Sequence, residues 1–537
     1  MPSATRLKHP LQGRAVAATL LATAGLLVAL AVVSRVFYRL VQLDEAAYSA
    51  ASITLAALGT PTFLVVLAIP AAGVVWLRRD LRWSDVVEGR LLRVVVLAAA
   101  GSLLVSLAFY EPNWFFGRAH LVDRALLVGL FVLSFWRPVA LVPFTVLAAV
   151  VASQFAVPLS RYTWNDKRLI FDVVILFCLA AGAGLLRRRE GVQAFVGAAC
   201  VLVVSWYLLA GVGKIALGWL GREELANMTR SAHLTGWLTA GTADRVAEVV
   251  ASVNWLLVAA AIVVEVAVVL LLLGRRPALA VLLALPGLHL LVFLLSGIFF
   301  WKWMVLELAL LVFFLRCHRE TLAAFGPALV LLALPVAVLS PRLFGVATLA
   351  WYDTPYSVNL ELEAVGESGT VYRVDRGDLA PYEVLLAQGR LSFVARPKVL
   401  VASAGTALDW KVASAIIDAE SPADLARAEA ELAVSHYQED DALAFDRFLR
   451  ERFDPWSEPP PLGPPHHIWT GRAPPILDVP ATGFDGQEEV TEVRVRMHKV
   501  WWDGDRYRPL ADCIVRVVPM DPAAGPPYVA PATACTL

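Results

Sequence analysis

Long apolar runs separated by short charged connections occupy the chain as far as residue 340. Each run has, or approaches, the roughly 20 residues that a helix needs to cross a bilayer. The runs cover residues 15–33, 51–77, 91–109, 124–136, 138–157, 169–186, 194–216, 251–273, 277–297, 299–315 and 322–340. Because a spanning segment must satisfy its own backbone hydrogen bonds, each run predicts a transmembrane helix, roughly eleven in all.

The charges between the runs predict an orientation. Arginines gather in every second connection, and cytoplasmic loops are the ones that retain Lys and Arg. The residues concerned are Arg78, Arg79, Arg82, Arg90, Arg93, Arg137, Arg187, Arg188, Arg189, Arg275, Arg276, Arg316 and Arg319. We therefore expect a multi-pass protein of the cell membrane, with a cytoplasmic N-terminus and with everything after Pro341 outside the cytoplasm.

Beyond residue 340 the pattern changes to that of a soluble domain. Residues 358–363 and 493–498 alternate apolar and polar side chains, as half-buried β-strands do, and 439–452 has a helical pattern. We expect residues 1–340 to form a polytopic α-helical membrane domain. Residues 341–537 are expected to form an extracytoplasmic α+β domain that is rich in strands.

Local signals refine the picture of this outer domain. Ser421 followed by Pro422 predicts a capped helix start. Asp503 followed by Gly504 predicts a hairpin turn. The proline-rich stretch 455–480 predicts an ordered, extended strap.

Composition agrees with a membrane protein and excludes some functions. Of the 537 residues, 58% are hydrophobic and 17% charged, and the 46 basic residues balance the 46 acidic ones, so no basic field indicates nucleic-acid binding. The five cysteines lack CxxC spacing, and we expect no metal site. Cys513 and Cys535 both fall in the outer domain, where a disulfide is permitted; two unpaired cysteines are an equal alternative.

Ionisable residues inside the apolar runs are the candidates for function, because charges at membrane depth are costly. They are Asp172, Lys214, Glu265, His289, Lys302 and Glu307. Asp172 and Lys302 lie near span ends, where snorkelling to the interface is favoured. Glu307 has a purely structural alternative, an ion pair with Lys302. For Glu265 and His289, function and structural pairing are equally supported.

Lys214 stands apart from an ordinary snorkelling lysine because of its neighbours. Gly211 and Gly213 precede it, which permits close helix approach or leaves room for a flat ligand, and Trp219 follows at the expected interface. Burial disfavours the charged form of a lysine. Lys214 is therefore a candidate base.

The stretch Tyr207–Trp219 resembles a segment of vitamin K-dependent gamma-glutamyl carboxylase and of the broader HTTM family of bacterial membrane proteins. In that family a Tyr–Ala-Gly–Lys–Trp pattern carries a lysine base. Residues 162–167 resemble the family's Ser-Trp-Asn-Asn-His loop. Glu265, a basic turn, His289 and two phenylalanines then follow in the family's order. The resemblance covers roughly residues 35–315 and indicates a divergent bacterial member.

The resemblance implies a definite chemistry of the carbon–carbon lyase type. Lys214 would deprotonate vitamin K hydroquinone or another quinol, oxygen would add, and the resulting strong base would take a proton from a glutamate side chain, which then captures carbon dioxide. The implied pocket residues are His289, Glu265, Trp219, Lys167 and Asn165. The implied partners are the lipid bilayer and an exported peptide or protein substrate. A dry membrane cavity would protect such a base from water.

Two departures from the family pattern weaken the simplest version of that chemistry. Lys167 stands where the carboxylase has a catalytic histidine, and an exposed lysine stays a cation, so the histidine's role does not transfer unchanged. Gly213 stands where the carboxylase has a second lysine. The alternative is a non-catalytic membrane protein of the same fold whose outer domain binds or matures an exported partner. A transporter is less favoured, because no inverted repeat is evident.

Overall fold

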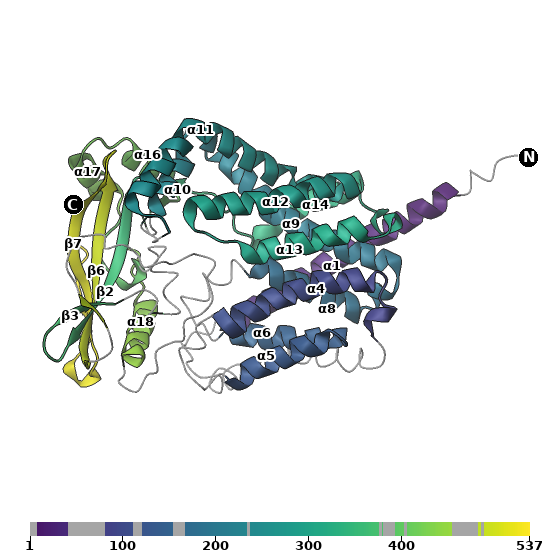
Figure 1. Ribbon diagram of the computed structural model, residues 1–537, viewed down its shortest axis with the longest axis horizontal. Coiled ribbons are helices and arrows are strands. Elements are labelled where there is room, and N and C mark those ends of the chain that lie inside the picture. The colour runs from purple at the N-terminus through teal and green to yellow at the C-terminus, as the bar shows by residue number, and fades with distance from the viewer. Residues whose placement is uncertain are drawn as a thin grey trace, which may run out of the picture.

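The molecule consists of a body of packed helices with a β-sheet domain at one end, and helix α1 (Lys8–Leu40), the first described element, begins at the opposite end (Figure 1). This computed structural model describes residues 8–40, 81–110, 121–153, 167–233, 237–374, 379, 392–401, 405–453, 482–484 and 488–537. The predicted division into a helical part and a strand-rich C-terminal part therefore appears directly in the architecture.

The helices follow the predicted apolar runs. Their bounds are α1 (Lys8–Leu40), α4 (Gly89–Leu104), α5 (Leu121–Ser134), α6 (Leu141–Ser153), α8 (Arg168–Gly182), α9 (Arg189–Ala216), α11 (Ala240–Ala267), α12 (Arg275–Ser296), α13 (Trp301–Arg316) and α14 (Pro327–Leu343). The predicted span over 51–77 lies outside the described residues.

Within the ranges given above, five helices are long and apolar enough to cross a membrane. They are Gly13–Arg35, Gly89–Ala108, Arg189–Ala216, Ala240–Leu272 and Arg275–Ser296. Other apolar helices are shorter; α5 and α6, for example, have 14 and 13 residues. Pro138 separates these two, because proline fixes its own φ and keeps the preceding Arg137 in an extended conformation. The architecture fits a membrane protein, with fewer full-length spans described than the sequence predicts.

Helix α9 lies at the centre of the helical body. It packs against α1, α8, α11 and α14, and residues 191–207 are buried throughout. A helix that is apolar on every side has no preferred solvent face, which is why α9 takes the central place. Lys214 lies in its last turn.

A short connection leads from α9 toward the outer domain. It contains η7 (Trp219–Gly221) and α10 (Glu224–Ser231), before the chain enters α11. α10 packs against α11 and α12 on one side and contacts the first strand of the outer domain on the other. This connection is therefore the junction between the two parts of the molecule.

The outer domain is built on a six-stranded sheet with the order β5-β3-β2-β6-β7-β8. The strands are β2 (Tyr356–Gly366), β3 (Val371–Arg373), β5 (Thr482–Gly483), β6 (Val490–Trp502), β7 (Tyr507–Pro519) and β8 (Tyr528–Val529); β1 (Tyr352–Asp353) pairs separately with β4 (Thr406–Ala407). Leu360 pairs with Met497 and Leu362 with Val495, so the predicted alternating residues form one buried face.

Helices α16 (Trp410–Ile417), α17 (Pro422–Leu432) and α18 (Glu439–Arg452) complete this domain. The predicted helix start is confirmed, because the Ser421 hydroxyl accepts the backbone N–H of Asp424. The predicted turn is confirmed as well: Gly504 has a φ of 102° in the loop that joins β6 to β7. The strap over 455–480 lies outside the described residues.

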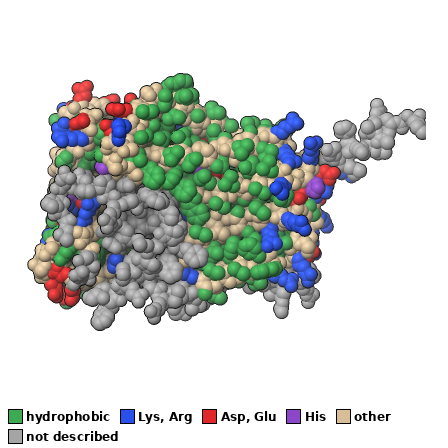
Figure 2. Space-filling view, in the orientation of Figure 1, with side chains coloured by type: hydrophobic (Ala, Val, Ile, Leu, Met, Phe, Trp, Pro, Cys, Tyr) green, Lys and Arg blue, Asp and Glu red, His purple; other side chains and the backbone are tan. Residues whose placement is uncertain are grey.

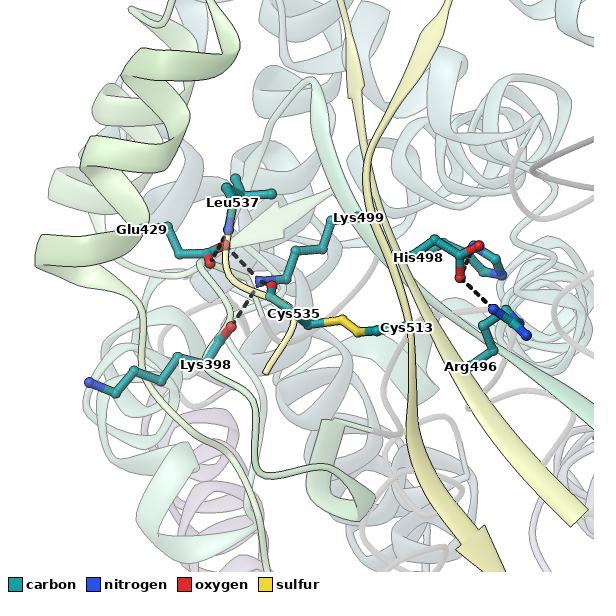
Figure 3. Close-up of a disulfide and its surroundings, with 9 residues drawn as sticks. Lys398, Glu429, Arg496, His498, Lys499, Cys513, Cys535 and Leu537 are labelled. Atoms are coloured by element: carbon teal, nitrogen blue, oxygen red, sulfur yellow. Dashed lines mark hydrogen bonds and ion pairs between the residues drawn. A yellow bond between two sulfur atoms is a disulfide. The ribbon is translucent and has the colours of Figure 1, made fainter. Parts of the chain in front are cut away.

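A disulfide joins Cys513 to Cys535 and decides between the two alternatives left open by the sequence. It lies beside a buried ion pair, in which Nζ of Lys499 is 2.7 Å from Oε2 of Glu429 (Figure 3). The same ammonium donates to the carbonyl of Cys535 at 2.6 Å, and Glu429 accepts the backbone N–H of Leu537 at 3.1 Å. Together these contacts fix the C-terminal tail against β6 and α17.

The molecular surface is divided into zones. Hydrophobic side chains cover the visible flank of the helices, and Lys and Arg side chains gather at the end opposite the sheet (Figure 2). Exposed arginines at the ends of helices include Arg187, Arg188, Arg189, Arg276 and Arg316. An apolar belt between two polar ends is the surface that a bilayer-embedded protein presents.

Candidate functional site

The predicted base Lys214 is ion-paired to Glu265 inside the helical body. Nζ of Lys214 is 2.6 Å from Oε1 and 2.8 Å from Oε2 of Glu265. Lys214 is 8% exposed and Glu265 7% exposed. The sequence placed both residues in the site, and the structure shows that α9 and α11 bring them into direct contact.

Small residues on α9 allow this contact. A Cβ atom built on Gly211 would lie 3.0 Å from Cβ of Glu265 and 3.0 Å from Cγ2 of Val266. Only glycine lets the two backbones approach this closely without displacing α11. Of the two functions weighed for this glycine, close helix approach is the one that the structure shows.

The Lys214 ammonium has two further neighbours at the C-terminal end of α9. The ring of Trp219 lies 5.2 Å from Nζ, within the range of a cation–π interaction. The carbonyl of Leu349 accepts from Nζ at 3.5 Å. Trp219 is held in turn by a hydrogen bond from its Nε1 to the carbonyl of Trp351, at 2.7 Å. The predicted pocket residue Trp219 therefore does lie against the lysine.

A second hydrogen-bonded group lies deeper in the body. The hydroxyl of Tyr207 on α9 contacts His289 of α12 and Glu307 of α13, and Nε2 of His289 is 3.1 Å from Oε1 of Glu307. All three side chains are buried. Glu307 thus takes its partners from two other helices, whereas the sequence offered Lys302 as its structural partner.

Aromatic rings surround this second group. The ring centroid of Trp303 lies 6.0 Å from that of His289, and Phe300 lies 5.0 Å from the same ring. Trp206 packs on Trp303 with centroids 5.2 Å apart. In the part of the chain that the structure describes, Oε2 of Glu307 and Nε1 of Trp206 are buried without a hydrogen-bond partner. One acceptor and one donor are therefore left over beside the aromatic rings.

The two groups lie along one face of α9. Tyr207 and Lys214 are seven residues apart on α9, which puts both side chains on the same face of the helix. Glu265 interacts electrostatically with both Lys214 and His289, and also with Tyr207. We call Tyr207, Lys214, Glu265, His289 and Glu307 the buried centre.

The remaining predicted residues have different outcomes. Lys167 is 2% exposed, so the expectation of an exposed cation is wrong: the first turn of α8 is packed inside the helical body. Asp172 and Lys302, 0% and 5% exposed, are also enclosed by protein and do not snorkel to an interface. Asp172 accepts a hydrogen bond from Ser34 at 2.9 Å. Asn165 lies outside the described residues.

The role of Tyr207 was not predicted. It belongs to the stretch that carries the resemblance, and its spacing of seven residues from Lys214 is the signal that places it on the same helix face. Its partner Glu307 could not be paired with it from the sequence, because the two residues lie 100 positions apart.

Within the described ranges, His, Cys, Asp and Glu side chains form no group of three that could hold a metal ion. Comparison of the chain with family models, curated proteins and solved structures finds no match. The resemblance to the carboxylase family therefore stays a prediction that depends on the residues quoted for it.

Proposed function

We propose that this protein is a carboxylase-like membrane enzyme in which the Lys214–Glu265 pair acts as a base toward a lipid-soluble quinol. The observation that carries the proposal is the direct contact between these two buried side chains, beside a second titratable group. Ionisable side chains that are held together at membrane depth are costly and mark functional sites by default. The proposed substrate is a glutamate side chain of an exported peptide or protein, with carbon dioxide and oxygen as co-substrates.

The pair can accept a proton in either of its two forms. In the ionic form, the carboxylate of Glu265 accepts it. In the neutral form, where one proton has already moved from Nζ of Lys214 to Glu265, Nζ accepts it. Both routes leave an ammonium next to a protonated carboxyl group. The ammonium then stabilises the anion that the acid leaves behind, and the scarcity of water strengthens that interaction.

The unpartnered atoms beside the aromatic rings fit a quinol hydroxyl. A hydroxyl group donates one hydrogen bond and accepts others. In this proposal Oε2 of Glu307 supplies the acceptor and Nε1 of Trp206 the donor. Both atoms are buried, and the packing of Trp206 on Trp303 supplies aromatic rings that suit a flat aromatic molecule. When bound, a quinol would supply an acidic hydroxyl group and the electrons that reduce oxygen.

We also propose that the chain spans the cell membrane about eleven times, with a cytoplasmic N-terminus and an extracytoplasmic sheet domain. Two observations support this orientation. Arginines gather at the end of the helices away from the sheet, as cytoplasmic ends do (Figure 2). The Cys513–Cys535 disulfide lies in the sheet domain, and disulfides persist in oxidising compartments.

Binding of a naphthoquinol to the purified full chain in lipid nanodiscs tests the proposal. We expect saturable quenching of tryptophan fluorescence and at least about tenfold weaker binding for Trp206→Phe, which removes the donor of the hydrogen bond proposed to the quinol. Trp136→Phe is the matched control, because that ring is 66% exposed. Equal binding by both variants would contradict the proposed ligand position, and an outer domain that acts only by binding an exported partner would then be the better account.

A further inference from the structure

The outer domain begins with a segment that lies directly over Lys214. The Leu349 carbonyl accepts a hydrogen bond from Nζ of this lysine at 3.5 Å. The next residue, Ala350, touches the same helix: its Cβ lies 2.9 Å from a Cβ built on Gly213. We call residues 349–353 the outer segment. It covers the end of α9 at the point where the candidate base lies.

The outer segment is also bound to the junction between α9 and α11. The carbonyl of Trp351 accepts from Nε1 of Trp219, and the carbonyl of Asp353 accepts from Nδ2 of Asn227 at 3.0 Å. These contacts involve backbone atoms of the segment and side chains of the helical body. The segment is also held by the pairing of β1 with β4 and by the ring of Tyr352, which is buried against Trp410. Lifting the segment therefore means breaking these contacts together with the polar ones.

Leu349 has an uncommon backbone conformation. Its φ of 38° lies in the left-handed region, which is unfavourable for a residue with a branched side chain. Such a conformation persists only where the surroundings impose it, and it is typical of clamps and switch regions. The covering position of the segment is thus maintained by its contacts against a local backbone preference.

Two buried carboxyl groups belong to the residues that join where the outer segment ends. Oε2 of Glu224 accepts the backbone N–H of Asp353 at 2.6 Å, and the two side chains interact electrostatically. Glu224 is 1% exposed and Asp353 5% exposed. Among the residues described, Oε1 of Glu224 is buried without a hydrogen-bond partner, while Oδ2 of Asp353 accepts from Nε1 of Trp351 at 3.0 Å. Two negative charges in this position would repel each other.

The other charged and titratable groups around the pair are few in the described structure. The guanidinium of Arg222 attracts the carboxylate of Glu224 electrostatically. Its Cζ also lies 3.4 Å from the ring centroid of Trp410, so that the two groups stack. On the β7 side, the phenol of Tyr507 interacts electrostatically with Asp353 and with Arg230 of α10. Of these two arginines, Arg222 lowers the pKa of Glu224, but the effect of burial, which raises that pKa, is larger.

We propose that the outer segment is a pH-dependent lid over the Lys214 site, which Glu224 and Asp353 hold shut while at least one of the two carboxyl groups is protonated. In calling the covered lysine the base, the inference rests on the proposed function; the lid itself depends only on the contacts above. A substrate that approaches Lys214 from the side of the sheet domain would have to displace this segment.

The direction of the pH effect follows from the two carboxyl groups. Burial raises the pKa of Glu224 from 4.5 to about 7, and burial together with Glu224 raises the pKa of Asp353 well above its usual value. A group whose pKa is higher in the closed form takes up a proton on closure. Closure is therefore strongest at low pH, and it weakens as the pH rises from the solvated pKa of Glu224, 4.5, through about 7.

Hydrogen–deuterium exchange of the full chain in nanodiscs, corrected for the intrinsic pH dependence of exchange, tests the lid. We expect the peptide covering residues 349–353 to lose about tenfold in protection between about pH 5 and about pH 8. Glu224→Gln keeps the acceptor oxygen but cannot ionise, so it should retain protection at the higher pH. Protection of β6 in the same spectra verifies that the variant is folded.

Glu223→Gln is the matched control, because the neighbouring Glu223 side chain is 62% exposed and should leave the pH dependence unchanged. If Glu224→Gln does not fold, Asp353→Asn tests the other side of the pair. The proposal would be overturned if the wild type showed the same protection at both pH values. It would also be overturned if the folded Gln or Asn variant kept the pH dependence. Because no turnover is measured, failure of the lid and failure of the proposed enzyme are distinguishable.

Discussion

Gly211 lies directly against Glu265, and a Cβ atom at the glycine would be 3.0 Å from the Cβ of that glutamate. The approach brings α9 and α11 together one turn before Lys214, so that the lysine can reach both carboxylate oxygens. The glycine therefore determines the geometry of the buried ion pair.

Gly211→Ala should separate α9 from α11 by a few tenths of an ångström and loosen the Lys214–Glu265 contact. Overpacking of this kind costs about 1–3 kcal/mol, so we expect a lower Tm in detergent. Gly129→Ala is the control, because a Cβ at Gly129 meets nothing within 4 Å. It should leave the Tm unchanged or raise it, and equal behaviour of the two variants would contradict the packing role of Gly211.

Tyr207→Phe should lower quinol-dependent turnover by at least about tenfold while the protein stays folded, because only the hydroxyl shared by His289 and Glu307 is removed. Tyr356→Phe is the matched control. The Tyr356 hydroxyl is buried and has no hydrogen-bond partner among the described residues, so its removal should not change turnover. Steady-state rates of both variants check this prediction. Turnover by Tyr207→Phe at the wild-type rate would show that the hydrogen-bonded group of Tyr207, His289 and Glu307 takes no part in the mechanism.

The apolar pattern predicted the position of most helices, since the length of an apolar run is a local property. Local chemistry also predicted the start of α17 at Ser421. Which side chains pair between helices could not be predicted from the sequence. Lys214 and Glu265, for example, are 51 positions apart, and only the packing of α9 on α11 brings them together.

Burial was the least predictable property of the charged residues. Asp172 and Lys302 were expected near an interface and Lys167 was expected to be exposed, yet protein encloses all three, because packing of whole helices decides their exposure. The cover that Leu349 provides over Lys214 also had no signal in the sequence. It depends on a left-handed backbone conformation at a leucine, where glycine would ordinarily be expected.

The free thiols of the purified protein provide a test of the proposed orientation. With the outer domain in an oxidising compartment, Cys513 and Cys535 should be joined, and only Cys178, Cys200 and Cys317 should react. Alkylation of the denatured protein followed by mass spectrometry should modify these three sites without reductant and all five cysteines with reductant. Modification of all five without reductant would contradict an extracytoplasmic sheet domain.

Glu429→Ala should destabilise the outer domain by about 3–5 kcal/mol, because it leaves the ammonium of Lys499 buried without its counter-ion. Burial already lowers the pKa of Lys499, and Glu429 counteracts that effect. The double variant Lys499→Met with Glu429→Leu should recover much of the loss. The free energy of unfolding of both variants can be measured in urea, by following hydrogen–deuterium exchange of the β6 amides. A double variant no more stable than Glu429→Ala would count against this account.

The most direct test of the proposed chemistry is the incorporation of labelled carbon dioxide into a glutamate-containing peptide by the purified protein, supplied with a reduced naphthoquinone and oxygen. The account predicts incorporation by the wild type and by Lys411→Met, an exposed control, and a loss of at least about 100-fold for Lys214→Met and for Glu265→Gln. Undiminished incorporation by folded Lys214→Met, or none by the wild type, would contradict it.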